Sequence, residues 1–99
     1  MGSREVIITQ TAAEQVAAIS WFIESKGLAD TADKFTDDAY DFFVKLANPK
    51  RSYTLCREPG RAALGYKCVT YKKKYTVVLI ETDEEIIVSE FISSKLIYW

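Results

Sequence analysis

The spacing of apolar residues in the first half of the chain predicts one short strand followed by two helices. Residues 4–9 (REVIIT) are short and rich in β-branched residues, as in a strand buried on both faces. A helix is predicted from Thr11, with Glu14 completing a capping box, to Lys26, where Gly27 stops it. Its apolar stripe comprises Ala12, Val16, Ile19 and Ile23, widened by Trp21 and Phe22.

The second helix is predicted from Asp30 or Thr31 to the ANP segment at residues 47–49. It ends there because a residue that precedes proline avoids helical backbone angles. Because only a few residues join the two helices, we expect an antiparallel helical hairpin. The apolar stripe of this helix comprises Ala32, Phe35, Ala39, Phe42 and Leu46.

The second half of the chain predicts a loop and three strands. Residues 48–63 hold both prolines and read as the loop, and strand patterns follow at residues 66–71, 74–82 and 85–92. Neither break between these strands has the Asn-Gly pair that favours a tight hairpin turn. The elements together predict one α+β domain over residues 1–99: an N-terminal strand, an antiparallel helical hairpin, then a three-stranded antiparallel meander. We expect one sheet packed by the helices on one face, with the first strand beside the last.

Charge falls into three blocks along the sequence. Residues 1–47 carry eight acidic and four basic side chains, a net charge of −4. Residues 48–75 carry eight basic and one acidic, a net +7, and residues 76–99 carry five acidic and one basic, a net −4. We expect the central block to form one positive patch, with Lys72, Lys73 and Lys74 at a hairpin tip. The alternative is that these lysines only keep an exposed tip soluble.

The amino-acid composition limits the catalytic and metal-binding groups that the chain can supply. The chain has no histidine, which removes the commonest general base and the commonest metal ligand. Cys56 and Cys68 are too few for a secreted scaffold, so we expect reduced, partly buried thiols in a cytoplasmic protein. We predict no metal site and no cofactor, since zinc would need carboxylates besides these thiols. No apolar run is long enough to span a bilayer and no signal peptide pattern opens the chain, so no membrane partner is predicted.

Five segments occur in a recognisable order: Ala12-Ala13, ADKF at 32–35, the helix end at 46–49, GYK at 65–67 and KKYTVVL at 73–79. In this order and spacing the sequence resembles the RelE/ParE superfamily, the toxins of bacterial type II toxin–antitoxin (plasmid stabilisation) systems. The resemblance covers nearly the whole chain. It implies a toxin that is held inactive by an antitoxin. The C-terminal segment of the antitoxin wraps around the toxin. Members of the RelE branch cut messenger RNA in the ribosomal A site, whereas members of the ParE branch inhibit DNA gyrase without a known nuclease site.

The resemblance also implies candidate site residues. Without histidine, a nuclease has to draw its catalytic groups from lysine, arginine, tyrosine or a carboxylate. Lys67 matches the strand lysine of the RelE branch, whereas Val69 and Thr76 stand where a second lysine and an arginine would be. The candidate catalytic residues are Lys67 and Arg61 on the phosphate, Tyr71 stacking on a base, and Lys95 from the tail. The candidate RNA-backbone contacts are Arg57, Lys72, Lys73 and Lys74.

Alternatives stay open for several of these residues. Tyr71 is also explained as a packing residue of a strand, and for any single tyrosine packing is the favoured interpretation. Glu58, the single acid of the basic block, is either a carboxylate base or a surface partner of Arg57 or Arg61. The apolar end KLIYW, residues 95–99, either folds back on the core or contacts a partner.

Three functions follow from the resemblance. The first is a toxin that acts as a ribosome-dependent mRNA endoribonuclease and is inhibited by its antitoxin. The second is a non-enzymatic, ParE-like inhibitor of DNA gyrase, and the third is an attenuated relative that only binds an antitoxin. The expected partners are a cognate antitoxin, together with the ribosome and mRNA or with gyrase, and a homodimer is a further option. The antitoxin tail should be partly acidic, to meet the basic block, and partly apolar.

Overall fold

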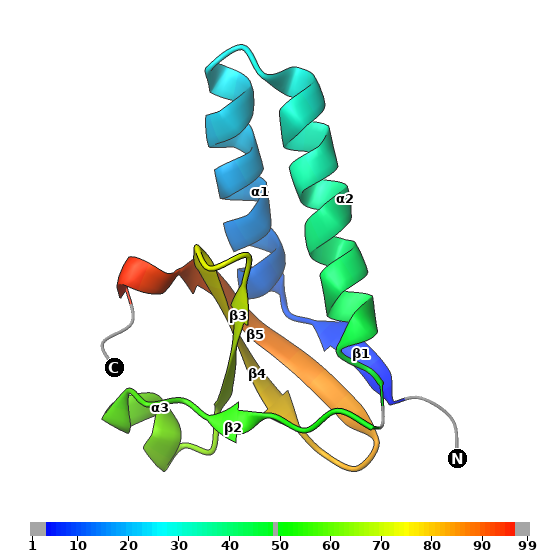
Figure 1. The fold of residues 1–99 in the computed structure, drawn as a ribbon, viewed down its shortest axis with the longest axis vertical. Helices are drawn as coiled ribbons and strands as arrows, with labels where there is room; N and C mark the ends of the chain where they lie inside the picture. The colour runs from blue at the N-terminus through cyan, green and yellow to red at the C-terminus, as the bar shows by residue number, and fades with distance from the viewer. Residues whose placement is uncertain (1–3, 49, 97–99) are drawn as a thin grey trace.

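The computed structural model describes residues 4–48 and 50–96 and contains one five-stranded sheet with a helical hairpin against one face. The elements in chain order are β1 (Glu5–Ile8), α1 (Gln10–Ser25), α2 (Ala29–Lys45), β2 (Thr54–Leu55), α3 (Pro59–Ala63), β3 (Lys67–Tyr71), β4 (Tyr75–Glu81), β5 (Glu85–Ser93) and the short 3₁₀ helix η1 (Ser94–Leu96). Figure 1 shows the base of the hairpin beside the sheet and its tip projecting beyond it. The α+β class and the hairpin are therefore confirmed.

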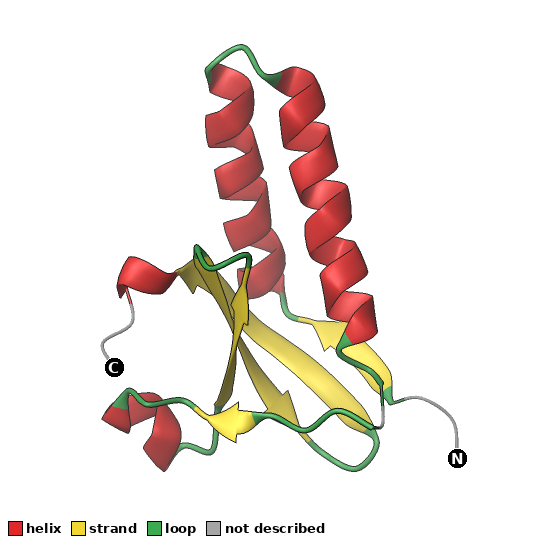
Figure 2. Ribbon diagram, in the orientation of Figure 1, coloured by secondary structure: helices red, strands yellow, loops and turns green. Residues whose placement is uncertain are grey.

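The strands are ordered β1-β5-β4-β3-β2. β1 runs parallel to β5, as expected for a first strand beside the last, and the other neighbours are antiparallel. Figure 2 shows the strands as one twisted layer, with α3 and η1 both on the left side of the view. The predicted meander is thus β3, β4 and β5, and β1 and β2 extend it on its two sides.

The prediction of a plain loop over residues 48–63 is wrong, because the segment contains β2 and α3. β2 has two residues, too few to leave a strand pattern in the sequence. α3 begins after Glu58, whose side chain accepts a hydrogen bond from the Arg61 amide, and Pro59 occupies its first position. Both features are ordinary helix-start signals, so α3 was detectable in the sequence.

The predicted capping box of Thr11 and Glu14 is also wrong. Thr9 caps α1, its Oγ1 accepting from the Ala12 amide at 3.1 Å. The same hydroxyl lies 3.0 Å from the Val88 carbonyl oxygen, to which it donates, so the cap ties the start of α1 to β5. Glu14 instead accepts a hydrogen bond from the side chain of Gln10.

The core lies between the hairpin and the sheet and is centred on Phe91 of β5, which is fully buried. Phe43 of α2 is buried beside it, whereas Phe35 and Phe42 of the predicted stripe are only partly buried around it. The rings around Phe91 lie at centroid distances of 5.1 to 6.0 Å and belong to Phe35, Phe43, Tyr71 and Tyr75.

The predicted widening of the α1 stripe by two aromatic residues is wrong. Trp21 and Phe22 are 69% and 56% exposed. They belong to the distal part of α1, where the hairpin extends past the sheet (Figure 1), so the sheet does not cover them.

A β-bulge in β5 decides which side chains reach each face of the sheet. Val78 of β4 pairs with Glu90, and the next residue, Leu79, pairs with Val88, so Ser89 is the extra residue. Ile86 and Val88 before the bulge and Phe91 after it all join the core on the helix side. Glu90 is thereby turned to the opposite face, which carries the candidate site.

Candidate functional site

The lysine tip is a tight turn with unusual backbone angles. The Lys74 amide donates to the Tyr71 carbonyl at 3.2 Å, and the two residues between them, Lys72 and Lys73, have φ of 52° and 63°. Positive φ at both central positions is the pattern of a type I′ hairpin turn, which favours asparagine and glycine. A lysine in this left-handed region costs about 1 kcal/mol relative to ordinary angles. The sequence therefore keeps two lysines where the backbone favours other residues.

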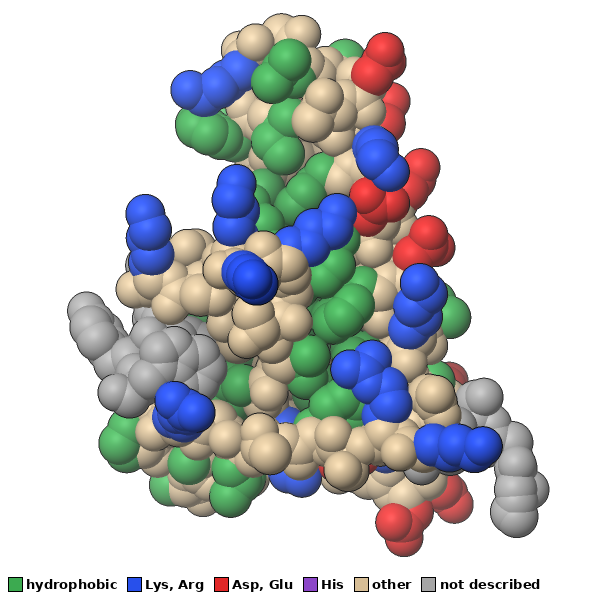
Figure 3. Space-filling view, in the orientation of Figure 1, with side chains coloured by type: hydrophobic (Ala, Val, Ile, Leu, Met, Phe, Trp, Pro, Cys, Tyr) green, Lys and Arg blue, Asp and Glu red, His purple; other side chains and the backbone are tan. Residues whose placement is uncertain are grey.

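The turn sends its lysines to different sides of the sheet. The Lys72 ammonium lies 3.4 Å from Asp38 Oδ2 on α2, whereas Lys73 lines a groove on the opposite face. Hydrogen bonds from Lys34 and Lys72 lower the pKa of Asp38, although burial opposes the shift. The expectation of one positive patch is therefore wrong, because the cations of residues 48–75 divide between two faces. In Figure 3 the Lys and Arg side chains stand at separate places around a strip of apolar side chains.

Lys67, the best match to the family pattern, is engaged in an ion-pair network on the helix side. Its ammonium lies 3.3 Å from Glu81 Oε1 and donates to the Tyr53 carbonyl at 3.1 Å. The other oxygen of Glu81 accepts from Arg4 Nη1 at 2.5 Å, and Arg4 Nη2 donates to the Asn48 carbonyl at 3.0 Å. Burial raises the pKa of Glu81, but the hydrogen bonds from Arg4 and Lys67 outweigh it and leave that pKa below its usual value. Lys67 therefore holds two chain segments together.

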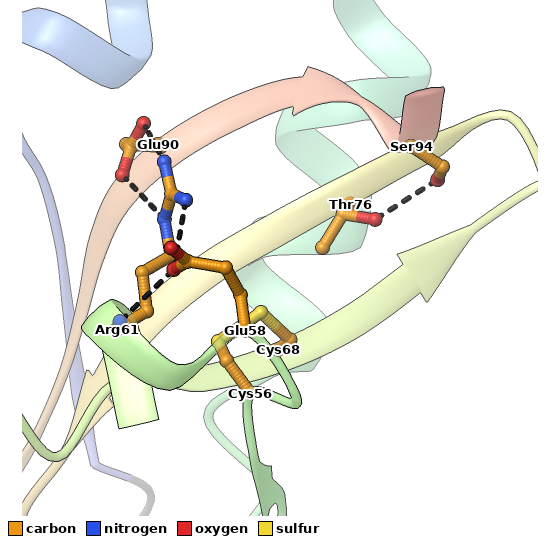
Figure 4. The surroundings of a disulfide bond; sticks show 7 residues. All are labelled: Cys56, Glu58, Arg61, Cys68, Thr76, Glu90 and Ser94. Carbon is orange, nitrogen blue, oxygen red and sulfur yellow. Dashed lines mark hydrogen bonds and ion pairs between the residues drawn. A yellow bond between two sulfur atoms is a disulfide. The ribbon is translucent and has the colours of Figure 1, made fainter. Parts of the chain in front are cut away.

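Arg61 is engaged on the opposite face. Figure 4 shows its guanidinium between Glu58 and Glu90. Its Nε and Nη2 donate to the two Glu90 oxygens at 3.2 and 3.1 Å, and Nη1 donates to Glu58 at 3.2 Å. The hydrogen bond to Glu90 raises the pKa of Arg61 further above its ordinary value, against a smaller opposing effect of burial. The alternative that made Glu58 a partner of Arg61 is confirmed.

Tyr71 and Lys95 differ in exposure. Tyr71 is 6% exposed, and its ring lies 4.7 Å from that of Phe42 and 5.8 Å from that of Phe91. For Tyr71 the geometry favours the packing alternative, since base stacking requires an open ring face. Lys95 is exposed in η1. The rest of the KLIYW tail, residues 97–99, lies outside the described residues.

A groove of about 410 Å³ lies on the sheet face opposite the hairpin. Its position follows from strand alternation, because Cys68 and Thr70 alternate with Lys67, Val69 and Tyr71, whose partners are on the helix side. The residues that line it are Thr54, Leu55, Arg57, Cys68, Thr70, Lys73 and Ser94.

The groove brings together two of the predicted RNA-backbone residues, Arg57 and Lys73, with three hydroxyl side chains. One of these, Ser94, is hydrogen-bonded to the buried Thr76 at 2.9 Å (Figure 4). Cations and hydroxyl groups are the donors that bind phosphate and carboxylate oxygens. Among the described residues that line the groove none is an acid, so the groove can hold an anion but supplies no carboxylate base.

A disulfide joins Cys56 and Cys68, with an S–S distance of 2.07 Å, so the expectation of reduced thiols is wrong. The bond is possible because Cys56 follows β2 directly, and β2 pairs with β3 so that Thr54 lies opposite Cys68. The two Cα atoms are 4.8 Å apart, within the usual range for a disulfide. Sequence alone could not reveal that the chain returns at this point, since β2 leaves no pattern.

Over the described ranges, no group of three or more Cys, Asp or Glu residues is arranged to hold a metal ion. None of the helices in the described part of the chain combines the length and the apolar character needed to cross a membrane.

Two of the carboxylates that engage the predicted cations, Glu81 and Glu90, were not predicted from the sequence. Glu81 follows the buried run of β4, and Glu90 lies on β5 next to the bulge. For Glu81 the sequence did hold a signal, because an acidic residue stands at the end of a strongly apolar strand pattern. Nothing in the sequence marked Glu90, because the bulge that turns it toward Arg61 is not readable from the residue pattern.

The comparison with solved structures is the informative one. No protein-family model matches the sequence, and no curated protein matches it. A chain of a solved structure described as the chromosomal ParDE TA (toxin–antitoxin) system from P. aeruginosa has the same fold, with a TM-score of 0.75. The similarity covers 92% of this chain and 96% of the other, at 15% sequence identity. The RelE/ParE-like fold implied by the sequence is therefore confirmed.

Proposed function

We propose that this protein is the toxin of a type II toxin–antitoxin pair and that it inhibits its target, DNA gyrase, by binding rather than by cutting RNA. The fold that it shares with a chain of the ParDE system supports a toxin. The engagement of Lys67 and Arg61 by carboxylates is the observation that favours binding over RNA cleavage.

Cleavage of RNA by its own 2′-hydroxyl needs a base for that hydroxyl, a cation for the phosphate and an acid for the leaving oxygen. To contact a phosphate, Lys67 would have to leave Glu81, and Arg61 would have to leave both Glu58 and Glu90. Departure of Lys67 would leave Glu81 with Arg4 as its remaining partner, and departure of Arg61 would take the cation from both Glu58 and Glu90, so each movement is unfavourable. Of the four predicted catalytic residues, only Lys95 has an exposed side chain in the described structure.

The lysine turn is the part of the surface best suited to dock a target. Lys72 and Lys73 keep a positive charge in backbone conformations that favour asparagine or glycine. Strained residues of this kind persist where the side chain has a use. The turn and the cations beside the groove, Lys73 and Arg57, would meet an acidic surface of the target.

The antitoxin would have a separate place on the helix side. A groove of about 280 Å³ lies between α2 and the lysine turn, lined by Asp38, Asp41, Phe42, Lys45, Tyr71 and Lys72. Its mixture of ring edges, acids and bases suits a segment that carries both apolar and charged side chains. A short gene beside this one that encodes an acidic-tailed protein, and copurification of the two products, would support the pair.

Two reconstituted assays separate the activities. We expect the isolated protein to inhibit DNA supercoiling by gyrase and to leave mRNA intact on ribosomes with a filled or empty A site. Cleavage of mRNA in the A site would refute the binding mechanism and restore the nuclease hypothesis, which the cations and hydroxyl groups of the groove favour. Absence of both effects would favour the attenuated relative.

A turn variant tests the docking surface. The double substitution Lys72→Asn and Lys73→Gly gives the turn its preferred residues and removes two charges. We expect the melting temperature to rise by a few degrees while inhibition of the target weakens and loses its dependence on salt. The matched control, Lys26→Gln with Lys50→Gln, removes two exposed charges elsewhere and should change neither quantity. Unchanged inhibition by the turn variant would show that the lysines serve solubility alone.

A further inference from the structure

We propose that the groove admits a small thiol that carries carboxylates and that this thiol opens the disulfide by attack on Cys68. Opening would release the segment of residues 57–66 from the sheet. The proposal concerns chemistry at sulfur and goes beyond the proposed function, since it holds whether or not the protein is a toxin.

Access to the two sulfurs is unequal. Cys56 is 3% exposed and forms a small buried cluster with Val78. Cys68 is half-buried and lines the groove. An attacking thiolate has to reach the sulfur it attacks, so the groove directs it to Cys68 and leaves the sulfur of Cys56 as the leaving group.

The groove also has the charge to attract such a reagent. Lys73 lines it together with Cys68, and no described lining residue is an acid. A cation about 6 Å from a unit charge in water changes its local concentration by about threefold. Thiols that carry a carboxylate, and the thiolate form itself, are therefore favoured over neutral and cationic thiols.

The chemistry balances with two equivalents of thiol. The first thiolate bonds to the Cys68 sulfur, the S–S bond breaks, and the Cys56 thiolate leaves and takes up a proton. The second thiolate attacks the outer sulfur of this mixed disulfide and releases the Cys68 thiolate, which is protonated in turn. The protein disulfide is reduced to two thiols, and two small thiols are oxidised to their disulfide.

The released segment has few other attachments. β2 pairs with β3 at two positions only, and α3 has five residues. Besides the disulfide, its described attachments include the Cys56 amide bonded to the Tyr66 carbonyl at 3.0 Å, the ion pair of Arg61 with Glu90, and the packing of Tyr66 against the cluster of Cys56 and Val78. The sheet around β1, β4 and β5 does not depend on the cross-link. Reduction should therefore loosen one corner of the molecule and widen the groove.

The first experiment measures reduction rates with 3-mercaptopropionate, mercaptoethanol and cysteamine, which are anionic, neutral and cationic. Each rate is divided by that thiol's rate with a small uncharged disulfide. At low salt we expect the anionic thiol to react at least about tenfold faster than the cationic one, and about 1 M salt should abolish the difference. Lys73→Gln should reduce the ratio about threefold or more, whereas Lys26→Gln, on the distant helix tip, should leave it unchanged.

Acid quenching and peptide mass analysis identify the cysteine that carries the first mixed disulfide. Modification of Cys68 supports the proposal. Modification of Cys56, a rate ratio near one in the wild type, or a ratio that Lys73→Gln does not change would overturn it.

Hydrogen exchange tests the release of the segment. After reduction, the amides of Cys56 and Tyr66, which bond to Tyr66 and Arg61 carbonyls, should exchange at least tenfold faster. The Thr9 amide, bonded to Val88 at 3.1 Å, should keep its protection. Unchanged exchange at Cys56 and Tyr66 would refute the release, and loss of protection at Thr9 would show general unfolding instead.

Discussion

Replacing Glu81 by glutamine tests whether Lys67 is a structural cation. The carboxylate is 15% exposed and receives hydrogen bonds from Arg4, which is 10% exposed, and Lys67, which is 27% exposed. Hydrogen bonds to charged groups contribute about 1.5–3 kcal/mol each, and the neutral amide keeps part of one. Arg4 Nε is already buried without a hydrogen-bond partner among the described residues, and Nη2 is engaged with the Asn48 and Arg51 carbonyls, so Arg4 is already short of one acceptor. We expect a loss of about 2–4 kcal/mol at pH 7, out of the roughly 5–15 kcal/mol typical of such a domain.

The dependence of stability on pH shows in which direction the difference between the wild type and Glu81→Gln should change. The folded pKa of Glu81 lies below its ordinary value of 4.5. The stability contributed by its charge is therefore fully present above about pH 4.5 and is lost as pH falls through the folded pKa. The wild type and Glu81→Gln should differ at pH 7 and converge in acid, because a protonated glutamate resembles glutamine.

Urea unfolding followed by circular dichroism, at steps from pH 7 to pH 2, measures this difference. Glu84→Gln, in the exposed turn after β4, is the matched control and should stay within about 0.5 kcal/mol of the wild type throughout. A difference below about 0.5 kcal/mol for Glu81→Gln at pH 7, or one that is the same at all pH values, would refute the network and leave Lys67 available for phosphate.

Three further predictions concern stability. Phe91→Ala should lower the free energy of unfolding, measured in urea, by about 3–5 kcal/mol, because the ring is fully buried. Trp21→Ala should change it by less than about 1 kcal/mol, because that side chain is 69% exposed. Similar losses in the two variants would contradict the assigned core. Thr9→Ala should cost about 1 kcal/mol or more, since the hydroxyl caps α1 and also donates to β5, and Thr9→Ser should recover most of it. Replacing both Cys56 and Cys68 by serine should lower the free energy of unfolding by about 3 kcal/mol through the loop-closure entropy of a 12-residue separation, and no change would mean that the bond does not form.

The large elements could be predicted from the sequence because each rests on a repeated local pattern. The hairpin followed from two apolar stripes, and the meander from three runs of β-branched residues. The errors arose where contacts between distant segments determine the cap of a helix or the burial of a side chain. Thr9 rather than Thr11 caps α1 because β5 supplies a carbonyl acceptor that no local pattern shows. Phe43 rather than Phe42 is fully buried because the sheet covers only one flank of α2.

The site could be predicted only in part, because a sequence shows which side chains are charged but not which of them form ion pairs. Arg57 and Lys73 do line one groove. Lys67 and Arg61 are each paired with an acid at least 14 residues away in the sequence, on another strand. The disulfide, the bulge and the positive φ of the lysine turn all depend on how distant segments meet, and none leaves a local signal.

The parallel pairing of β1 with β5 sets the order in which this molecule is completed. β1 is made first, yet its neighbour in the described sheet is the last strand to leave the ribosome. At synthesis rates of roughly 5–20 residues per second, β1 waits several seconds unpaired. A message truncated before β5 would yield a product in which β1 has no ladder to join and the aromatic core lacks Phe91. Incomplete translation should therefore yield only unfolded fragments.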